Sequence, residues 1–286
     1  MKKLQKIIVY VTKDPLGTLG WLVIIFFGLT AIFASHIVPY DPNARNYENG
    51  KLIRLEPPSS EHLFGTTYYG QDVLSQTIMG TQVSVLVGLV SAFGTTVVGT
   101  IVGLVAGYYG KWVDDVLMRI TDVAYGTPVL GCAIVLVAVL GPSVWNVILV
   151  ISMLLWRTTA RSIRAQTLTL KERPFIWAAK AAGASPFRIM FVHIFPSVAS
   201  LSFFYAALGV GGAVLSESGI SFLGLGDPLR TSWGQMLYFA FITASIRRAW
   251  WWVVAPGACI SLFVMASYFV GRSFDKIFNP KLSAGW

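Results

Sequence analysis

The sequence predicts an all-α polytopic membrane protein with six transmembrane helices, and three observations support this fold class. Hydrophobic residues make up 55% of the 286 residues and charged residues only 12%, whereas soluble domains contain roughly 25% charged residues. Several apolar runs approach or exceed the roughly 20 residues that a helix needs to cross a bilayer. The net charge of +9 is spread over the loops and forms no basic patch typical of nucleic-acid binding. We therefore expect a lipid membrane, and no nucleic acid, around this chain.

The predicted spans follow one another along the whole chain. By residue number they are 17–38, 83–108, 122–140, 144–156, 191–216 and 249–271. Gly126 and Pro128 interrupt the third span, because proline removes a helical hydrogen bond. The remaining parts are the N-terminus 1–16, a long polar segment 39–81 that includes a turn and an amphipathic helix within 62–80, a charged turn 110–119, a basic loop 157–188, an irregular glycine-rich segment 217–248 and a tail 273–286.

Lys and Arg are divided unequally between the two sets of connections. Sixteen of the 22 lie at the N-terminus, in the charged turn, in the basic loop and in the tail with Arg272 just before it, and six lie in the other connections. Cytoplasmic loops of membrane proteins carry an excess of Lys and Arg. Both termini and the basic loop are therefore predicted to face the cytoplasm, and 39–81 is predicted to be extracytoplasmic.

The basic loop contains clear helix boundaries. Pro174 suits the first position of a helix, where its missing N–H needs no partner, and the alanines after it favour helix. Gly183 suits the left-handed residue that ends a helix, and Ser185 before Pro186 has the pattern of a second helix start. The loop is predicted to hold a short helix with a low-relief surface. Either another protein approaches this surface closely, or the helix rests on its own protein.

Gly99, Gly103 and Gly107 recur every four residues on one face of the second span. Small residues at this spacing let two helices pack closely in lipid. The stripe is predicted to pack another helix, and two interpretations stay open. The partner helix belongs either to a translocation path or subunit interface, or to this chain itself.

Charged residues near the ends of the spans form another candidate group. Asp115, Arg119 and Asp122 have the spacing of ion pairs along one helix face. Glu217, at the end of the fifth span, is a candidate pathway or gate residue, because ionisable residues near membrane depth are often functional. Glu217 is equally consistent with an interfacial residue that faces water.

The sequence contains no motif for catalysis or for a bound cofactor. The three His residues are scattered over three segments and predict no metal site. The two Cys residues lie inside apolar runs and predict no disulfide. The glycine and lysine pattern of a phosphate-binding loop does not occur. We expect no cofactor, no metal and no ATP hydrolysis by this chain alone.

Several motifs resemble those of one transporter family. The basic loop resembles the "EAA" loop of bacterial and archaeal ABC-importer permeases at Ala178, Ala179, Gly183, Ile194 and Pro196. Other segments are similar to signatures of the C-type permease subunit of peptide/nickel ABC importers. These segments are 62–80, 107–115, 118–122, 221–226 and 232–234, followed by a Trp-Trp pair and a Pro-Gly pair.

The resemblance implies a type I ABC importer permease fold, with a five-helix core domain (82–272) after the first span and a cytoplasmic coupling helix within the loop 170–188. It implies four partners: a second, B-type permease in a heterodimer, two ABC ATPase subunits and an extracytoplasmic solute-binding protein. The residues implied to meet an ATPase are Pro174, Trp177, Ala178, Ala179, Lys180, Ala182 and Gly183. Trp177 stands where the family has glutamate, so we expect an apolar or cation–π contact there. Alternatively, Trp177 packs against its own spans.

The resemblance implies import of oligopeptides or dipeptides across the cell membrane. Oligosaccharides are the alternative substrate within the family. A secondary transporter that needs no ATPase is the alternative from another class. Such a transporter would need buried acids near the middle of a span for ion coupling, and no predicted span has an acid at its centre.

Overall fold

The computed structural model describes residues 14–48 and 50–278, and helices dominate this part of the chain. Its one sheet within these ranges is the hairpin of β1 (Tyr47–Glu48) and β2 (Lys51–Leu52). The helices are α2 (Pro15–Ile37), α3 (Val73–Tyr109), α4 (Lys111–Gly126), α5 (Val129–Leu140), α6 (Val144–Leu155), α7 (Arg157–Leu170), α8 (Pro174–Ala181), α9 (Pro186–Arg188), η1 (Ile189–Ile194), α10 (Phe195–Ile220), η2 (Ser221–Leu225), α11 (Trp233–Ile242) and α12 (Trp250–Phe278). The predictions for 1–13 and 279–286 lie outside the described residues.

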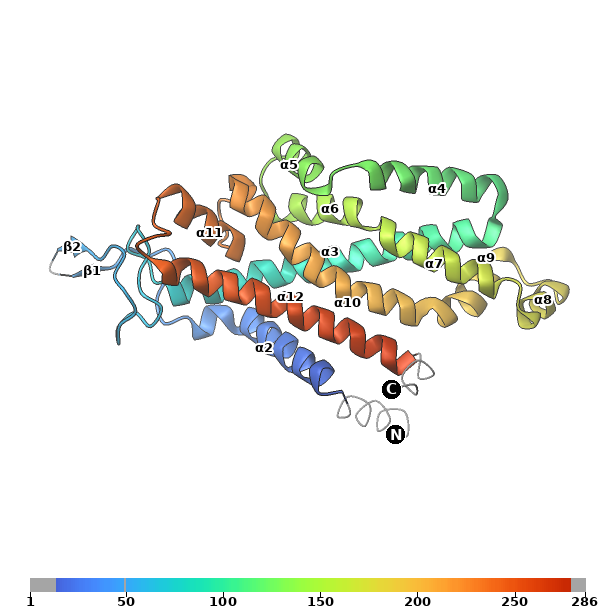
Figure 1. Cartoon of the computed structure of the whole chain (residues 1–286), viewed down its shortest axis with the longest axis horizontal. Coiled ribbons are helices and arrows are strands. Elements are labelled where there is room, and N and C mark those ends of the chain that lie inside the picture. Colours follow the sequence, from blue (N-terminus) through green and yellow to red (C-terminus); the bar gives the residue numbers. More distant parts are fainter. Residues whose placement is uncertain (1–13, 49, 279–286) are drawn as a thin grey trace.

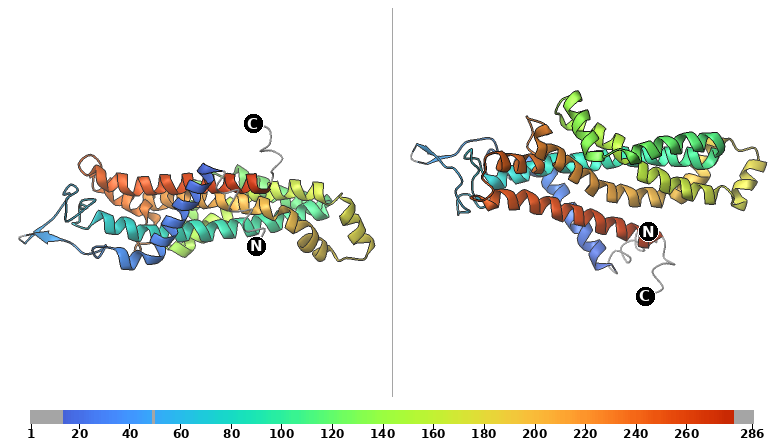
Figure 2. Two further views of the ribbon diagram at one scale, coloured as in Figure 1. Left: turned by 90° about the horizontal axis from the view of Figure 1, so that it is seen from below. Right: turned by 45° about the horizontal axis from the view of Figure 1, so that its top comes forward.

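The long helices α3, α10 and α12 run side by side along the molecule, and α2 lies obliquely against α3 and α12 (Figures 1 and 2). The hairpin β1–β2 and helix α11 lie at one end of the molecule, which we call the hairpin end (Figure 1). Helix α8 lies at the opposite end, which we call the α8 end (Figure 1). The chain therefore carries its irregular segments at two separate ends of a helical body.

Four helical segments among the described residues are long and apolar enough to cross a membrane, and the bent pair α4 and α5 is a fifth candidate. The four are Pro15–Ile37, Val73–Tyr109, Pro186–Leu225 and Trp250–Phe274. The bend between α4 and α5 is 91°, and it lies at the predicted interruption, where Pro128 precedes α5. Helix α6 has only 12 residues, fewer than a bilayer requires. The prediction of a multi-pass helical membrane protein is confirmed, whereas six single spanning helices are not seen.

Two predicted boundaries in the first half were wrong. Helix α3 begins at Val73, so the amphipathic helix expected before residue 83 is the start of the same long helix. Asp72 caps it by accepting a 2.7 Å hydrogen bond from the Ser75 backbone N–H. The charged turn expected at 110–119 is confined to Gly110, whose positive φ of 65° reverses the chain, and α4 begins at the next residue.

Two predicted loops are also largely helical. The basic loop begins with α7, which continues from α6 after Trp156, and the glycine-rich segment includes the end of α10 and helix α11. Residues of α7 alternate between a polar face and a buried face that includes Ile163 and Thr167. A polar composition predicts a loop only when nothing packs against the segment, and here α3 packs against α7.

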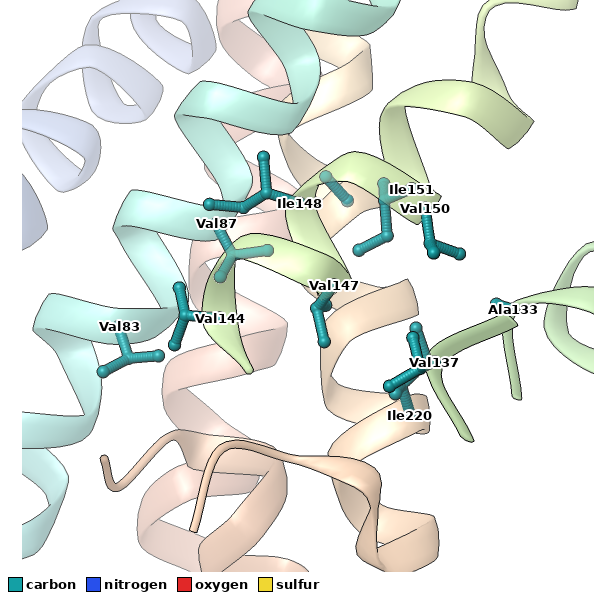
Figure 3. Packing of buried hydrophobic residues seen from close by; sticks show 11 residues of the cluster. Val83, Val87, Ala133, Val137, Val144, Val147, Ile148, Val150, Ile151 and Ile220 are labelled. Carbon is teal, nitrogen blue, oxygen red and sulfur yellow. The ribbon is translucent and has the colours of Figure 1, made fainter. Parts of the chain in front are cut away.

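One buried apolar cluster joins α3, α5, α6 and α10 (Figure 3). Val87, Val137, Val150 and Ile220 are fully buried in it. Burying such side chains contributes about 1.5–3 kcal/mol each relative to leaving them exposed in water. In a bilayer the tight packing itself, rather than exclusion of water, holds these short and long helices together.

The glycine stripe of α3 packs against α7. A Cβ atom on Gly103 would lie 2.6 Å from the carbonyl oxygen of Ala160, and one on Gly107 would lie 2.6 Å from Cβ of Thr167. Gly99 is equally close to α7. Side chains at these positions would force the two backbones apart. The helix that meets the stripe therefore belongs to this chain.

The described ends of the chain lie beside each other. A Cβ atom on Gly20 would lie 2.9 Å from the carbonyl oxygen of Ala266, and one on Gly17 would lie 2.9 Å from Cβ of Ser273. The beginning of α2 thus packs against the last part of α12. Both ends of the described chain are on the same side of the helical body.

Candidate functional site

Helix α8 has the boundaries that its sequence predicts. Pro174 is its first residue and follows an extended Arg173. Gly183 has a φ of 76°, the left-handed conformation that ends a helix without strain only for glycine. The side chain of Ser185 accepts a hydrogen bond from the Arg188 N–H and so caps α9. The short helix, its end and the cap of the next helix are therefore confirmed.

A single side chain anchors α8 to the rest of the protein. Ile176 is fully buried in a cluster with Leu104 of α3, Ile163 of α7 and Ile194 of η1. Sequence reasoning did not select Ile176. A usable signal was present, because it is the one aliphatic side chain between two aromatic ones at the start of a helix otherwise rich in alanine. Ile176 fixes α8 to the end of three helices at once.

The predicted ATPase-coupling residues gather on the free surface of α8. The side chains of Phe175 and Trp177 are 46% and 60% exposed. The Lys180 ammonium lies 5.8 Å from the Trp177 ring centroid and 5.7 Å from that of Tyr108. The alternative in which Trp177 packs against its own spans is wrong. Exposed members of the predicted set are Pro174, Trp177, Ala178, Lys180, Ala182 and Gly183, and Ala179 is half-buried.

Ion pairs between α4 and α7 hold the two helices that lead to this end. Arg164 binds both carboxylate oxygens of Asp114. Arg161 pairs with Asp122, and its guanidinium lies 4.0 Å from the Tyr125 ring centroid. These contacts cross from one helix to another.

The ion pairs predicted along the face of one helix do not form. In the part of the chain that the structure describes, Arg119 pairs with neither Asp115 nor Asp122. Asp122 turns instead to Arg161 of α7. The spacing indicates which residues share a face of α4, but it does not identify their partners. Arg161 on the neighbouring helix α7 is the cation that lies within reach of Asp122.

Glu217 lies in the interior of the protein near the hairpin end. It is 2% exposed, and its carboxylate accepts hydrogen bonds from the hydroxyls of Ser221 at 2.6 Å and Ser84 at 3.4 Å. The interpretation of Glu217 as an interfacial residue that faces water is wrong. Helix α10 extends to Ile220, so the predicted span ended too early and left this acid outside it.

Helix α11 is fastened to the same place by residues that sequence reasoning missed. The backbone N–H of Trp233 donates to the Ser84 hydroxyl at 3.3 Å, and its indole N–H donates to the carbonyl oxygen of Thr77 at 3.1 Å. Trp233 is fully buried. Ser84 therefore links Glu217 of α10 to α11 from a position on α3. The Ser-Trp-Gly motif signalled this helix, but its partners are far away in the sequence.

Metal-binding side chains do not assemble in the described ranges. No group of three or more His, Cys, Asp or Glu residues there is arranged to hold a metal ion. His62 is buried and its Nδ1 lies 2.9 Å from the Asp72 carboxylate. This pair joins the polar segment to the start of α3 and leaves Asp72 free to cap that helix with its other oxygen.

Comparison with known proteins identifies two family regions and several relatives. Residues 99–284 match the binding-protein-dependent transport system inner membrane component, and residues 5–58 match the N-terminal transmembrane domain of oligopeptide transport permease C. The chain is 36% identical over 95% of its length to a dipeptide transport system permease protein of Alkalihalophilus pseudofirmus, of which 88% is covered.

Two further relatives also match this chain over most of their length. The chain is 34% identical to a di/tripeptide transport system permease protein of Pseudomonas aeruginosa, over 94% of this chain and 89% of the relative. It is 35% identical to a glutathione transport system permease protein of Pectobacterium atrosepticum, over 89% and 83%. With a family match over more than half of its length and relatives covered almost end to end, the chain belongs to the binding-protein-dependent transport system inner membrane component family.

Proposed function

We propose that this chain and a second, B-type permease form the membrane path of an ATP-driven importer of short peptides. The relatives named above are permeases for dipeptides, di- and tripeptides and glutathione, which supports peptides over oligosaccharides. As a permease component, the chain carries no catalytic activity of its own. ATP is hydrolysed by two separate ATPase subunits, and an extracytoplasmic solute-binding protein delivers the peptide.

The observation that carries this proposal is the attachment of α8. Its exposed face offers Trp177 and Lys180 to another protein, while Ile176 locks its other face into α3, α7 and η1. A protein that displaces α8 therefore displaces the ends of long helices rather than a loose loop. Packed interiors deform little, so such a displacement is transmitted along the helices. We infer that α8 is the coupling helix through which the ATPases act.

The orientation and the number of crossings belong to the same proposal. We infer that the α8 end is cytoplasmic, because it carries the basic segment 157–188. The bent pair α4–α5 then makes one crossing, and α6 together with α7 makes another. With α2, α3, α10 and α12 this gives six crossings. The adjacent ends of α2 and α12 agree with both termini on one side.

Purification of the four-subunit complex tests the proposal. We expect the two ATPases to co-purify with this chain and its partner permease. Proteoliposomes supplied with the external binding protein should take up a labelled dipeptide only with ATP inside, and take up an oligosaccharide of similar size much less. Uptake without ATPases, driven by an ion gradient, would contradict the proposal and favour a secondary transporter. Preference for the oligosaccharide would contradict the substrate class alone.

A further inference from the structure

A small polar pocket of about 270 Å³ opens at the hairpin end. Its walls come from the segment around Arg45, the segment that leads into α3 with the first turn of that helix, the segment before α11 that holds Arg230, α11 itself and the start of α12. Figure 1 shows these segments together at that end of the molecule. None of the residues that line the pocket belongs to α8, and Glu217 is not among them.

Three residues that line this pocket carry hydrogen-bond donors in their side chains. The exposed residues Arg45 and Arg230 both line it, and neither forms an ion pair in the ranges that the structure describes. Trp252 also lines the pocket and is 1% exposed, yet its indole N–H has no acceptor. A buried donor without a partner is uncommon, because it has lost its hydrogen bond to water. An acceptor that carries negative charge would satisfy all three groups.

No acidic side chain lines the pocket to supply that charge. Three acids close in sequence to the lining residues have other partners. Asp72 accepts hydrogen bonds from the backbone N–H and the hydroxyl of Ser75. Asp41 accepts a hydrogen bond from the Asn43 backbone N–H at 2.9 Å. Asp227 accepts from the backbone N–H groups of Leu229 at 2.9 Å and Val144 at 3.2 Å. The two arginines therefore keep a local excess of positive charge.

The walls of the pocket are held in place before any ligand arrives. The amide of Gln76 donates to the Pro42 carbonyl oxygen at 3.2 Å and to the Gln71 side chain at 2.9 Å. The amide of Gln235 donates to the Asp227 carbonyl oxygen at 3.0 Å. These bonds fix both loops that carry the arginines. A preformed site loses less entropy on binding than one that must be ordered first.

The shape and the apolar lining restrict the ligand. Tyr69 and Phe239 lie on one wall with their ring centroids 6.0 Å apart, and Met236 adjoins them. A volume of about 270 Å³ is just below the range of roughly 300–1,000 Å³ typical of sites that enclose a drug-sized ligand. It suits one terminal residue, with a carboxylate for the arginines and a side chain for the aromatic wall. Arginine is the residue best suited to bind a carboxylate through paired hydrogen bonds.

We propose that the pocket between Arg45 and Arg230 binds the free C-terminal carboxylate of a short peptide. This inference rests on the proposed function, because it requires peptides as substrates and the hairpin end as the outer side. It adds a recognition step by the permease itself. The chemical group recognised is the terminal carboxylate, whatever the identity of the last side chain.

Calorimetric titration of the assembled complex in nanodiscs, without the external binding protein, tests this inference. The probes are dialanine and dialanine amide, which differ only in the terminal charge. The wild-type complex is expected to bind dialanine roughly tenfold more tightly or better, as expected for a charge-assisted hydrogen bond. Arg45→Gln and Arg230→Gln should each remove most of this preference and leave the amide affinity unchanged. Arg54→Gln is the matched control, because Arg54 is exposed at the same end, lies 5.2 Å from the Tyr68 ring centroid and does not line the pocket.

Three results would overturn the inference. They are equal binding of the two probes, no binding of either probe, and an unchanged preference in both arginine variants. A second titration, with the external binding protein as the titrant, distinguishes the remaining source of a carboxylate. If the two variants weaken only the docking of that protein, the arginines pair with an acidic side chain of the binding protein and the peptide site is rejected. Failure of the proposed function looks different: the wild-type complex would then import no peptide with ATP, whatever the titration gives.

Discussion

The carboxylate of Glu217 accepts a 2.6 Å hydrogen bond from the hydroxyl of Ser221, at the point where α10 changes into η2. The same carboxylate reaches Ser84 of α3, which in turn accepts from the backbone of α11. Beyond it, Gly224 has a φ of 85° and turns the chain toward α11. Glu217 thus joins three helices at the hairpin end, opposite the end where α8 lies.

Replacement of Glu217 tests this junction. Glu217→Leu leaves the hydroxyls of Ser84 and Ser221 without their acceptor in the interior, and it should lower the free energy of unfolding by about 2 kcal/mol or more. Glu217→Gln retains one acceptor oxygen and should lose less. Denaturant unfolding of the purified complex measures both. Equal losses in the two variants would show that the hydrogen bonds are unimportant and only the volume matters.

The close packing of α3 on α7 gives a prediction about Gly103. Gly103→Ala places a methyl group 2.6 Å from the Ala160 carbonyl oxygen, and overpacking of this kind costs about 1–3 kcal/mol. Gly257→Ala in α12 is the control, because nothing lies within 4 Å of the added atom. There alanine should be neutral or slightly stabilising, as its helix propensity is higher. Thermal unfolding of both variants decides, and equal midpoints would contradict the predicted contact.

A double-mutant cycle measures the ion pair between α4 and α7. Asp114→Asn and Arg164→Gln, singly and together, should give a coupling energy of about 1 kcal/mol. Asp122 and Arg161 form the comparison pair, with side chains 60% and 47% exposed, against 12% and 33% for Asp114 and Arg164. The more exposed pair should couple less strongly and lose its coupling in high salt. A larger coupling in the exposed pair would refute this ranking.

The exposed ring of Trp177 gives a prediction about coupling to ATP hydrolysis. Trp177→Ala should lower the amount of peptide imported per ATP several-fold, because it removes the large apolar ring that we expect to contact the ATPase. Trp177→Phe should retain more activity. Both variants should bind the ATPases and keep wild-type stability. If all three proteins import equally well, Trp177 has no part in coupling.

Ile176→Ala separates anchoring from contact with the ATPase. Ile176 is fully buried under α8, and removing such a side chain costs about 2–5 kcal/mol in well-packed interiors. This variant should therefore be less stable, unlike Trp177→Ala, and the comparison shows which effect causes a loss of import.

Cysteine labelling tests the proposed topology. Cysteines are introduced singly at Glu48 and at Thr169, both exposed and at opposite ends of the molecule, after Cys132 and Cys259 have been replaced by alanine. A maleimide that cannot cross the membrane should label position 48 in intact cells, and position 169 only after the cells are opened. Labelling of both positions from outside would rule out the assigned orientation.

Features that depend on neighbouring residues could be predicted from the sequence. The composition required a membrane, and Pro174, Gly183 and Ser185 fixed the limits of α8, because each acts on the backbone of its own segment. The glycine stripe likewise predicted a close helix contact. The sequence did not identify the partner of the stripe, because small residues indicate a close helix contact but not which helix makes it.

Features that depend on distant residues were decided by the tertiary structure. The polar helix α7 looked like a loop, because packing against α3 rather than its own hydrophobicity stabilises it. The partners of Glu217 and Asp114 lie on other helices, as do the two arginines that line one pocket. A charged side chain binds the opposite charge or the hydrogen-bond donor that folding brings near it. The sequence by itself therefore determined the class of protein and the short helix α8, and packing determined which polar groups meet.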